Sequence, residues 1–158
     1  MALEVNSAAP LFKVKTNGGE EISLSDYKGK WLVLYFYPKD NTPGCTKEAC
    51  SFRDNMEDIT KLGAVVIGVS PDSVASHDKF VKKLDLNFLL ASDEDNSISL
   101  QYGVWIEKNR CGKKSFGVER TTFIIDKEGM IQYIFSKVKA DGHALEVIEK
   151  LKELMQGS

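Results

Sequence analysis

The segment 31–45 reads WLVLYFYPKDNTPGC, and it predicts both the fold and the site of this chain. Its first half, residues 31–37, is an unbroken run of aromatic and aliphatic residues, which is typical of a strand buried on both faces of a sheet. Pro38 ends the run, because proline cannot donate a ladder hydrogen bond. A polar loop follows, and from Cys45 the residues favour a helix as far as Leu62. A buried strand, a loop and a helix in this order predict an α/β unit.

Strands and helices continue to alternate on both sides of this segment. Further strands are predicted at residues 11–14, 21–24, 64–69, 88–91, 121–125 and 130–135. Further helical segments are predicted at residues 25–29, at 73–84 and from Asp141 onward. The first two strands flank Asn17-Gly18-Gly19, which predicts a hairpin turn. We therefore expect an α/β fold of thioredoxin-like type: a central mixed β-sheet flanked by helices, with an N-terminal β-hairpin, as a single domain over residues 1–158.

The composition excludes several classes of function. The chain has 158 residues, 42% of them hydrophobic and 28% charged, which is typical of a globular domain. A net charge of -2 gives no electrostatic basis for binding nucleic acid or an anionic membrane. The apolar run 31–37 is too short to span a bilayer. The first residues, MALEVN, have no basic start followed by an apolar stretch, so we expect a cytoplasmic protein.

Cys45 is the candidate nucleophile. It opens a helix, where unpaired N–H groups and the helix dipole stabilise an anion, and the thiolate is the reactive form of cysteine. Gly44 lets the backbone approach closely, and Pro38 stiffens the loop. Thr42 can offer its hydroxyl to the sulfur or to a bound oxygen. The alternative is that Cys45 merely packs under the helix, since free cysteine is often buried and inert.

Cys50 follows Cys45 by five residues. On one continuous helix their Cα atoms would lie roughly 8–9 Å apart, whereas a disulfide needs about 7 Å or less. The pair can therefore form a disulfide only if the first turns of the helix unwind. This spacing favours a redox cycle with a conformational step over a permanent crosslink, and a buried helical Cys50 is the alternative.

The pattern Pro38-x-x-x-Thr42-x-x-Cys45 resembles the active-site motif of the peroxiredoxins. The string GCTKEAC over residues 44–50 is similar to that of their bacterioferritin comigratory protein subfamily, also called peroxiredoxin Q, and VERTTFIID over residues 118–126 is a second family-like block. The resemblance spans the whole chain. It implies that Cys45 is the peroxidatic cysteine and Cys50 the resolving one.

The resemblance also implies roles for the surrounding residues. Thr42 would bind the peroxide oxygens, Pro38 would shield the pocket, and Gly44 would contribute to substrate binding. Arg120 would fix the thiolate and polarise the peroxide, which suits a permanently charged group with several donors; its alternative is a solvated strand-edge arginine. Glu48 would support the arginine, or serve only as a first-turn acid favoured by the helix dipole.

The implied activity is thiol peroxidase. Cys45 would become a sulfenic acid, Cys50 would resolve it as an intramolecular disulfide, and a thioredoxin-type dithiol would reduce that disulfide. No metal, flavin or haem is required. We expect a monomer, because this subfamily often resolves within one chain, and the sequence leaves a dimer open. A disulfide oxidoreductase would instead want Cys-x-x-Cys, and a non-catalytic interaction domain would have no need of Thr42, Cys45 and Arg120 together.

Three other candidates carry a weaker signal. Cys111 lies in the basic segment KNRCGKK, residues 108–114, which predicts a turn-rich loop with an exposed, incidental thiol. His77 and His143 have no ligand spacing with each other or with the cysteines, so no metal site is expected. We predict both histidines to be ordinary, partly exposed helix residues.

Overall fold

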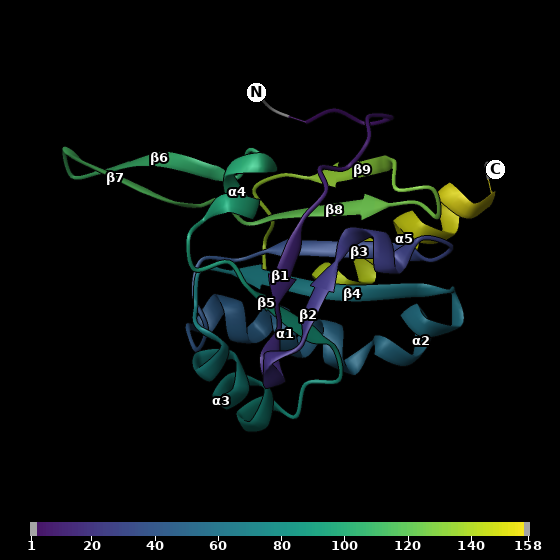
Figure 1. Ribbon diagram of the computed structural model, residues 1–158, viewed down its shortest axis with the longest axis horizontal. Helices are drawn as coiled ribbons and strands as arrows, with labels where there is room; N and C mark the ends of the chain where they lie inside the picture. Colours follow the sequence, from purple (N-terminus) through teal and green to yellow (C-terminus); the bar gives the residue numbers. More distant parts are fainter. Residues whose placement is uncertain (1–2, 157–158) are drawn as a thin grey trace.

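The structure, a computed structural model, describes residues 3–156 apart from the side chain of Arg110. β3 (Trp31–Phe36) forms the centre of a five-stranded sheet of order β5-β4-β3-β8-β9 (Figure 1). β4 (Ala64–Ser70) and β5 (Leu89–Ser92) run parallel to it, whereas β8 (Thr121–Ile125) is antiparallel to β3, and β9 (Ile131–Phe135) is antiparallel to β8. Every residue of β3 is buried, as its unbroken apolar run predicts. The predicted central mixed sheet is confirmed.

Different elements cover the two faces of this sheet. Behind it in Figure 1 lie α1 (Pro43–Asp54) and α5 (His143–Gln156). Their apolar residues share one cluster with those of α2 (Met56–Lys61) and α3 (Val74–Leu84). The opposite face packs against β1 (Lys13–Lys15), β2 (Glu21–Ser23), the 3-10 helix η2 (Leu24–Tyr27) and α4 (Ser97–Gln101). Both layers share the sheet, so the chain buries its apolar side chains on both sides of β3.

The N-terminal hairpin is present as predicted. β1 and β2 pair antiparallel with Val14 opposite Ile22, and both side chains are buried against the sheet. The turn is the 3-10 helix η1 (Asn17–Gly19), in which Gly18 and Gly19 adopt φ of 82° and 85°. Glycine adopts this conformation without the steric penalty of a side chain, which is why the Asn-Gly-Gly sequence supplies the turn.

Two predictions about local structure were wrong. The single helix expected up to Leu62 is two helices, because Asn55 interrupts it with φ -109° and ψ 11°. The Asn55 side chain donates to the carbonyl of Ser51 at 2.8 Å, a local bond of the kind that competes with helix continuation.

The basic segment near Cys111 is a hairpin and not a loop. β6 (Trp105–Arg110) and β7 (Lys113–Val118) pair antiparallel and project from the body of the protein (Figure 1). Cys111 and Gly112 form the turn, both with positive φ, which matches the twist of two-residue hairpins. Most side chains along β7 are exposed, so β7 does not show the alternation of apolar and polar residues that would have predicted a strand.

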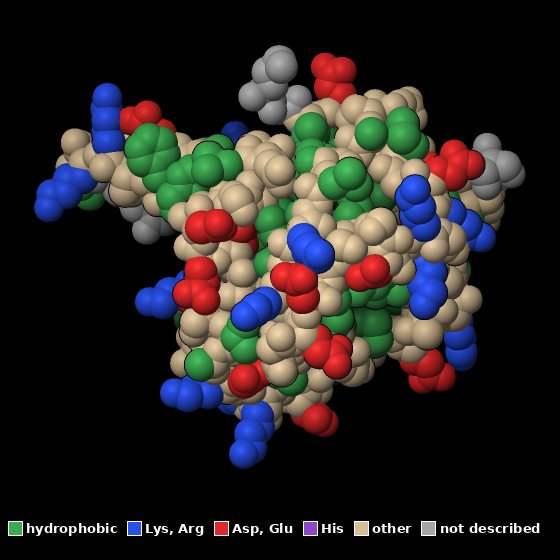
Figure 2. Space-filling model, in the orientation of Figure 1, with side chains coloured by type: hydrophobic (Ala, Val, Ile, Leu, Met, Phe, Trp, Pro, Cys, Tyr) green, Lys and Arg blue, Asp and Glu red, His purple; other side chains and the backbone are tan. Residues whose placement is uncertain are grey.

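The molecular surface carries both signs of charge. On the face shown in Figure 2, Lys and Arg side chains are interspersed with Asp and Glu, and hydrophobic patches lie between them. Among residues 3–156, none of the helices is long and apolar enough to cross a membrane.

Candidate active site

The carboxyl end of β3 leads directly into the predicted site. The backbone of Tyr37 still donates to the carbonyl of Val69 at 3.0 Å, and the half-buried Pro38 then turns the chain out of the sheet. α1 begins at Pro43, a residue that suits the first turn because its missing N–H would have no partner there. Cys45 therefore lies in the first turn of α1, at the positive end of the helix dipole. Open α/β sheets commonly place their sites at this edge.

Arg120 links Cys45 to a buried carboxylate. Its Nη2 donates to Cys45 Sγ at 3.3 Å, and its Nη1 donates to Glu48 Oε1 at 2.6 Å. Arg120 lies between β7 and β8, and its carbonyl accepts a hydrogen bond from the N–H of Val138, which fixes the backbone there. Arg120 therefore joins Cys45 and Glu48 into one hydrogen-bonded group, although it lies 75 residues from Cys45 in the sequence. Such an arrangement favours the thiolate, since the guanidinium directs a charged donor at the sulfur.

Burial governs the electrostatics of this group. Cys45 is 2% exposed and Glu48 is 0% exposed. Burial raises the pKa of Glu48 to about 7, although the charge and hydrogen bond of Arg120 partly oppose the rise. Burial alone would lower the pKa of Arg120, but the negative charges of Glu48 and Cys45 raise it above its ordinary value. Arg120 therefore keeps its charge, while the charge of Glu48 depends on pH near neutrality.

Gly44 makes room for the guanidinium. A Cβ atom at this position would lie 3.1 Å from Arg120 Nη2, which is tighter than an ordinary van der Waals contact. The absence of a side chain thus lets Arg120 approach the first turn of α1 and reach the sulfur.

Thr42 and Pro38 are near the sulfur along the chain but do not join the Arg120 group. The Thr42 hydroxyl donates to the carbonyl of Lys39 at 3.1 Å, which closes the loop before α1. Its oxygen retains acceptor capacity, as a hydroxyl can accept while it donates. The structure therefore brings Gly44, Cys45, Glu48 and Arg120 together, while the hydroxyl of Thr42 is engaged within its own loop.

The three cysteines are all free thiols in different surroundings. Cys45 and Cys50 lie on the same helix, α1, which runs from Pro43 to Asp54. Cys50 is partly exposed and Cys111 is exposed at the tip of the β6–β7 hairpin (Figure 1). The distance argument from the sequence therefore applies: Cys45 and Cys50 cannot be bridged while α1 keeps its first turns.

Both histidines are completely buried, so the prediction of partial exposure was wrong. His77 Nδ1 lies 2.7 Å from Asp40 Oδ2, and its Nε2 lies 2.9 Å from the carbonyl oxygen of Ala91. His143 Nε2 lies 2.7 Å from Thr122 Oγ1. Its Nδ1 lies 3.3 Å from Glu146 Oε1. Burial lowers the pKa of His143, although the hydrogen bond and charge of Glu146 partly oppose this shift. Each ring therefore has a polar partner at both of its nitrogens, which accommodates it in the interior.

Asp40 is a structural residue of the loop that sequence reasoning missed. Its Oδ1 accepts from Tyr37 Oη at 2.6 Å, and its Oδ2 accepts from Ser76 Oγ at 2.8 Å and lies beside His77. Asp40, Asp72 and His77 bring potential metal-ligating atoms together within 4.8 Å. Those atoms already have partners, since Asp72 Oδ2 accepts from the Asp40 N–H at 2.7 Å and from Ser70 Oγ at 2.7 Å. The cluster is therefore a hydrogen-bond network that holds the loop against α3.

Comparisons with known proteins identify the family of this chain. The model of the AhpC/TSA family matches residues 5–134. A putative peroxiredoxin bcp of Coxiella burnetii is 55% identical over 151 residues, covering 96% of this chain and 100% of the relative. Peroxiredoxin Bcp of Bacillus subtilis is 48% identical over 156 residues, covering 99% of each.

Solved structures give the same result. A structure of Xanthomonas campestris bacterioferritin comigratory protein, described in terms of alkyl peroxide reduction, superimposes with a TM-score of 0.87 at 42% identity and covers 90% of each chain. Xanthomonas campestris peroxiredoxin Q gives 0.89 at 40% identity, covering 94% of this chain and 98% of that one. The thioredoxin-like fold and the resemblance found in the sequence are both confirmed. This chain belongs to the AhpC/TSA family, and within it to the peroxiredoxins of the Bcp, or peroxiredoxin Q, type, which are peroxidases.

Proposed function

We propose that this peroxiredoxin reduces hydrogen peroxide and organic hydroperoxides through the thiolate of Cys45, with Cys50 as its resolving partner. The observation that carries the proposal is the pair of hydrogen bonds from Arg120, one to Cys45 Sγ at 3.3 Å and one to Glu48 Oε1 at 2.6 Å. The same guanidinium that stabilises the thiolate can polarise a peroxide bound next to the sulfur. Glu48 then acts on the reaction only through Arg120, as a positioning residue.

In the first step the Cys45 sulfur forms a bond to the terminal oxygen of the hydroperoxide. The O–O bond breaks, and the departing oxygen takes a proton and leaves as water or an alcohol, so Cys45 is oxidised to a sulfenic acid. Thr42 can receive a peroxide hydroxyl at its oxygen, Gly44 leaves space beside the sulfur, and Pro38 restricts access of water to the pocket.

In the second step Cys50 attacks the sulfenic acid. The Cys50 sulfur forms the disulfide with Cys45, and the sulfenic oxygen leaves as water with the proton of the Cys50 thiol. The first turns of α1 must unwind before the two sulfurs can meet. A dithiol protein of thioredoxin type then reduces the disulfide by exchange and is itself oxidised.

We further propose that residues 1–158 act as a single domain and as a monomer in the cytoplasm. The support is that both apolar clusters pack on one sheet, and that both proposed redox cysteines lie on one helix of one chain. Intramolecular resolution needs no second subunit.

The decisive experiment compares peroxide turnover, driven by a thioredoxin system, in the wild type and in three single variants. Cys45→Ser should abolish turnover, Cys50→Ser should block recycling, and Cys111→Ser should leave turnover at the wild-type rate. Peptide mass spectrometry of the oxidised wild type should find a Cys45–Cys50 disulfide. A disulfide that includes Cys111, or one between chains, would refute the role of Cys50.

A further inference from the structure

A groove beside the Cys45 loop is lined by lysines. It lies between the loop that precedes α1 and the outer side of α3, and its volume is about 560 Å³. Lys39 and Thr42 contribute from the loop, and Lys79 and Lys83 contribute from α3. All three lysines are exposed. The groove is therefore open to solvent and rimmed by cations from two elements.

The acidic residues of the groove form no ion pair with these lysines among the described residues. Asp40 and Asp72 direct their carboxylates into the loop network, where backbone N–H and hydroxyl groups and the ring of His77 bind them. Neither Lys39 nor Lys79 has an ion-pair partner within the described residues, and Lys83 donates to the neutral Asn41 side chain at 2.5 Å. With three lysines at its rim and two aspartates turned into the loop network, the groove has an excess of positive charge in a chain whose net charge is -2.

The helix dipole alone does not account for these cations. Lysines in the last turn of a helix complement its negative end, and this explains Lys83. Lys79 lies before that turn, and Lys39 belongs to a loop. A surface that binds a negatively charged partner would account for Lys39, Lys79 and Lys83 together.

The groove is not the peroxide site itself. Neither Cys45 nor Arg120 lines it, and Cys45 is only 2% exposed. Thr42, which caps the start of α1, is the point where groove and site meet.

The groove instead borders the segment that must move. If α1 unwinds from its start, the Cys45–Cys50 disulfide forms directly beside Thr42 and the lysine-lined edge. We propose that this groove is the docking surface for an acidic dithiol protein that reduces the disulfide. The inference rests on the proposed resolving cycle, because it assumes the Cys45–Cys50 disulfide, and charge complementarity identifies the partner as acidic.

The test isolates the reduction step. Wild type and a Lys39→Glu/Lys79→Glu variant are oxidised with one equivalent of peroxide, and the loss of two thiols is verified. Each disulfide form is then mixed with a thioredoxin of net negative charge, or with the small neutral dithiol dithiothreitol, and the second-order rate constant is measured. This pair leaves the Lys83–Asn41 contact intact.

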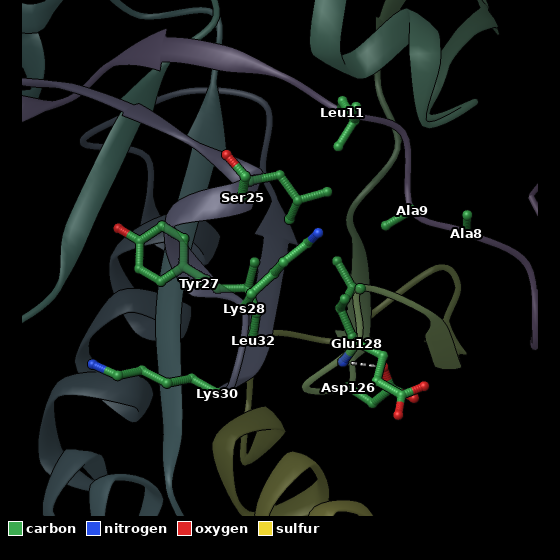
Figure 3. Close-up of a pocket in the computed structure, with 13 residues that line it drawn as sticks. Ala8, Ala9, Leu11, Ser25, Tyr27, Lys28, Lys30, Leu32, Asp126 and Glu128 are labelled. Atoms are coloured by element: carbon green, nitrogen blue, oxygen red, sulfur yellow. Dashed lines mark hydrogen bonds between the residues drawn. The ribbon is translucent and has the colours of Figure 1, made fainter.

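A matched control carries the same change in net charge elsewhere. Lys28 and Lys30 precede β3, at the end of the strand opposite Pro38, and line a different pocket with Leu11 and Leu32 (Figure 3). Neither lysine forms an ion pair among the residues described. The control variant is Lys28→Glu/Lys30→Glu.

We expect the rate with thioredoxin to fall about tenfold or more in Lys39→Glu/Lys79→Glu, the range over which electrostatic steering changes association rates. The control variant should stay within about twofold, the rates with dithiothreitol should be unchanged, and added salt should slow only wild type and control. Equal losses in both variants, an unchanged thioredoxin rate, or no reduction by thioredoxin at all would overturn the docking site. Failure of the wild type to lose two thiols would instead refute the resolving cycle, and the docking site with it.

Discussion

Replacing Glu48 by glutamine should stabilise the folded protein and weaken its peroxidase activity. Glu48 is fully buried, and burial raises the pKa of its carboxyl from 4.5 to about 7 in spite of Arg120. Its Oε2 has no hydrogen-bond partner among the described residues. Glutamine has nearly the shape of the protonated carboxyl and keeps an oxygen that can accept from Arg120, but it brings no charge into the interior.

The magnitude follows from proton linkage. Between the unfolded pKa of 4.5 and the folded pKa of about 7, the folded carboxyl holds a proton that the unfolded one has lost. The free energy of unfolding therefore falls as pH rises, by about 1.4 kcal/mol per pH unit from this group. Across the interval between the two values the loss is about 3 kcal/mol, and it is complete above the folded pKa. Glu48→Gln lacks this loss.

Unfolding by guanidinium chloride at several pH values from about 4.5 to 8 measures the free energy of unfolding of both proteins. The difference between variant and wild type should be smallest at the acid end and reach about 3 kcal/mol at the alkaline end. At pH 8 the rate of Cys45 oxidation by peroxide should fall about tenfold, since Arg120 loses a charged anchor. Two stability curves that run parallel with pH, or a variant less stable than wild type at pH 8, would refute the claim that ionisation of the buried Glu48 destabilises the folded protein.

Arg120→Lys should slow the oxidation of Cys45 about a hundredfold and leave the circular dichroism spectrum unchanged. Lysine keeps the charge but lacks the planar fork of donors that bonds the sulfur and Glu48 Oε1 together. Normal turnover would remove Arg120 from the mechanism. Cys50→Ser should complete its first turnover at the wild-type rate and then accumulate Cys45 sulfenic and sulfinic acids, detected by mass spectrometry. In the wild type, oxidation should accelerate amide exchange from about Thr42 to Cys50 and leave the last turn of α1 protected. Exchange that accelerates along all of α1, or nowhere in it, would contradict that unwinding.

The fold was predictable where burial leaves a strong pattern. The strand at residues 31–37 is apolar throughout because both of its faces are covered, and β3 is indeed fully buried. The break at Asn55 was not predictable in the same way, because it depends on one side chain bonding to Ser51 within an otherwise helical sequence. The β6–β7 hairpin was missed because most of β7 is exposed, so that strand carries no periodic signal.

Sequence reasoning named candidate residues for the site but could not predict their connections. The motif around Cys45 identifies the loop and helix, but the contact of Arg120 with Cys45 joins residues 75 apart, and only the resemblance to a family indicated it. The buried partners of His77 are likewise remote, since Asp40 lies 37 residues away. A histidine on an apolar helix face gives no sign of whether it points to water or to a buried carboxylate, and this is why its burial was not expected.

In the proposed cycle α1 holds Cys45 in place before the reaction and releases it afterwards, and its contacts divide accordingly. The C-terminal half is anchored by bonds that do not involve the sulfur: Arg53 Nη1 donates to the carbonyl of Leu84 at 2.6 Å, and Ser51 Oγ accepts from the Ala144 N–H at 3.2 Å. The N-terminal half is held by Arg120, whose bond to Cys45 is strongest when the sulfur is an anion.

Oxidation of the sulfur weakens that hold selectively. A neutral sulfenic acid is a weaker acceptor than a thiolate, so the bond from Arg120 to Cys45 weakens, while the bond from Arg120 to Glu48 and the anchors at Ser51 and Arg53 are unaffected. In the proposed cycle we therefore expect the turn at Cys45 to unwind first, which would bring Cys45 toward Cys50. The chemistry of the first step thus supplies the condition for the second, because the group that positions the thiolate has less affinity for the product that must move.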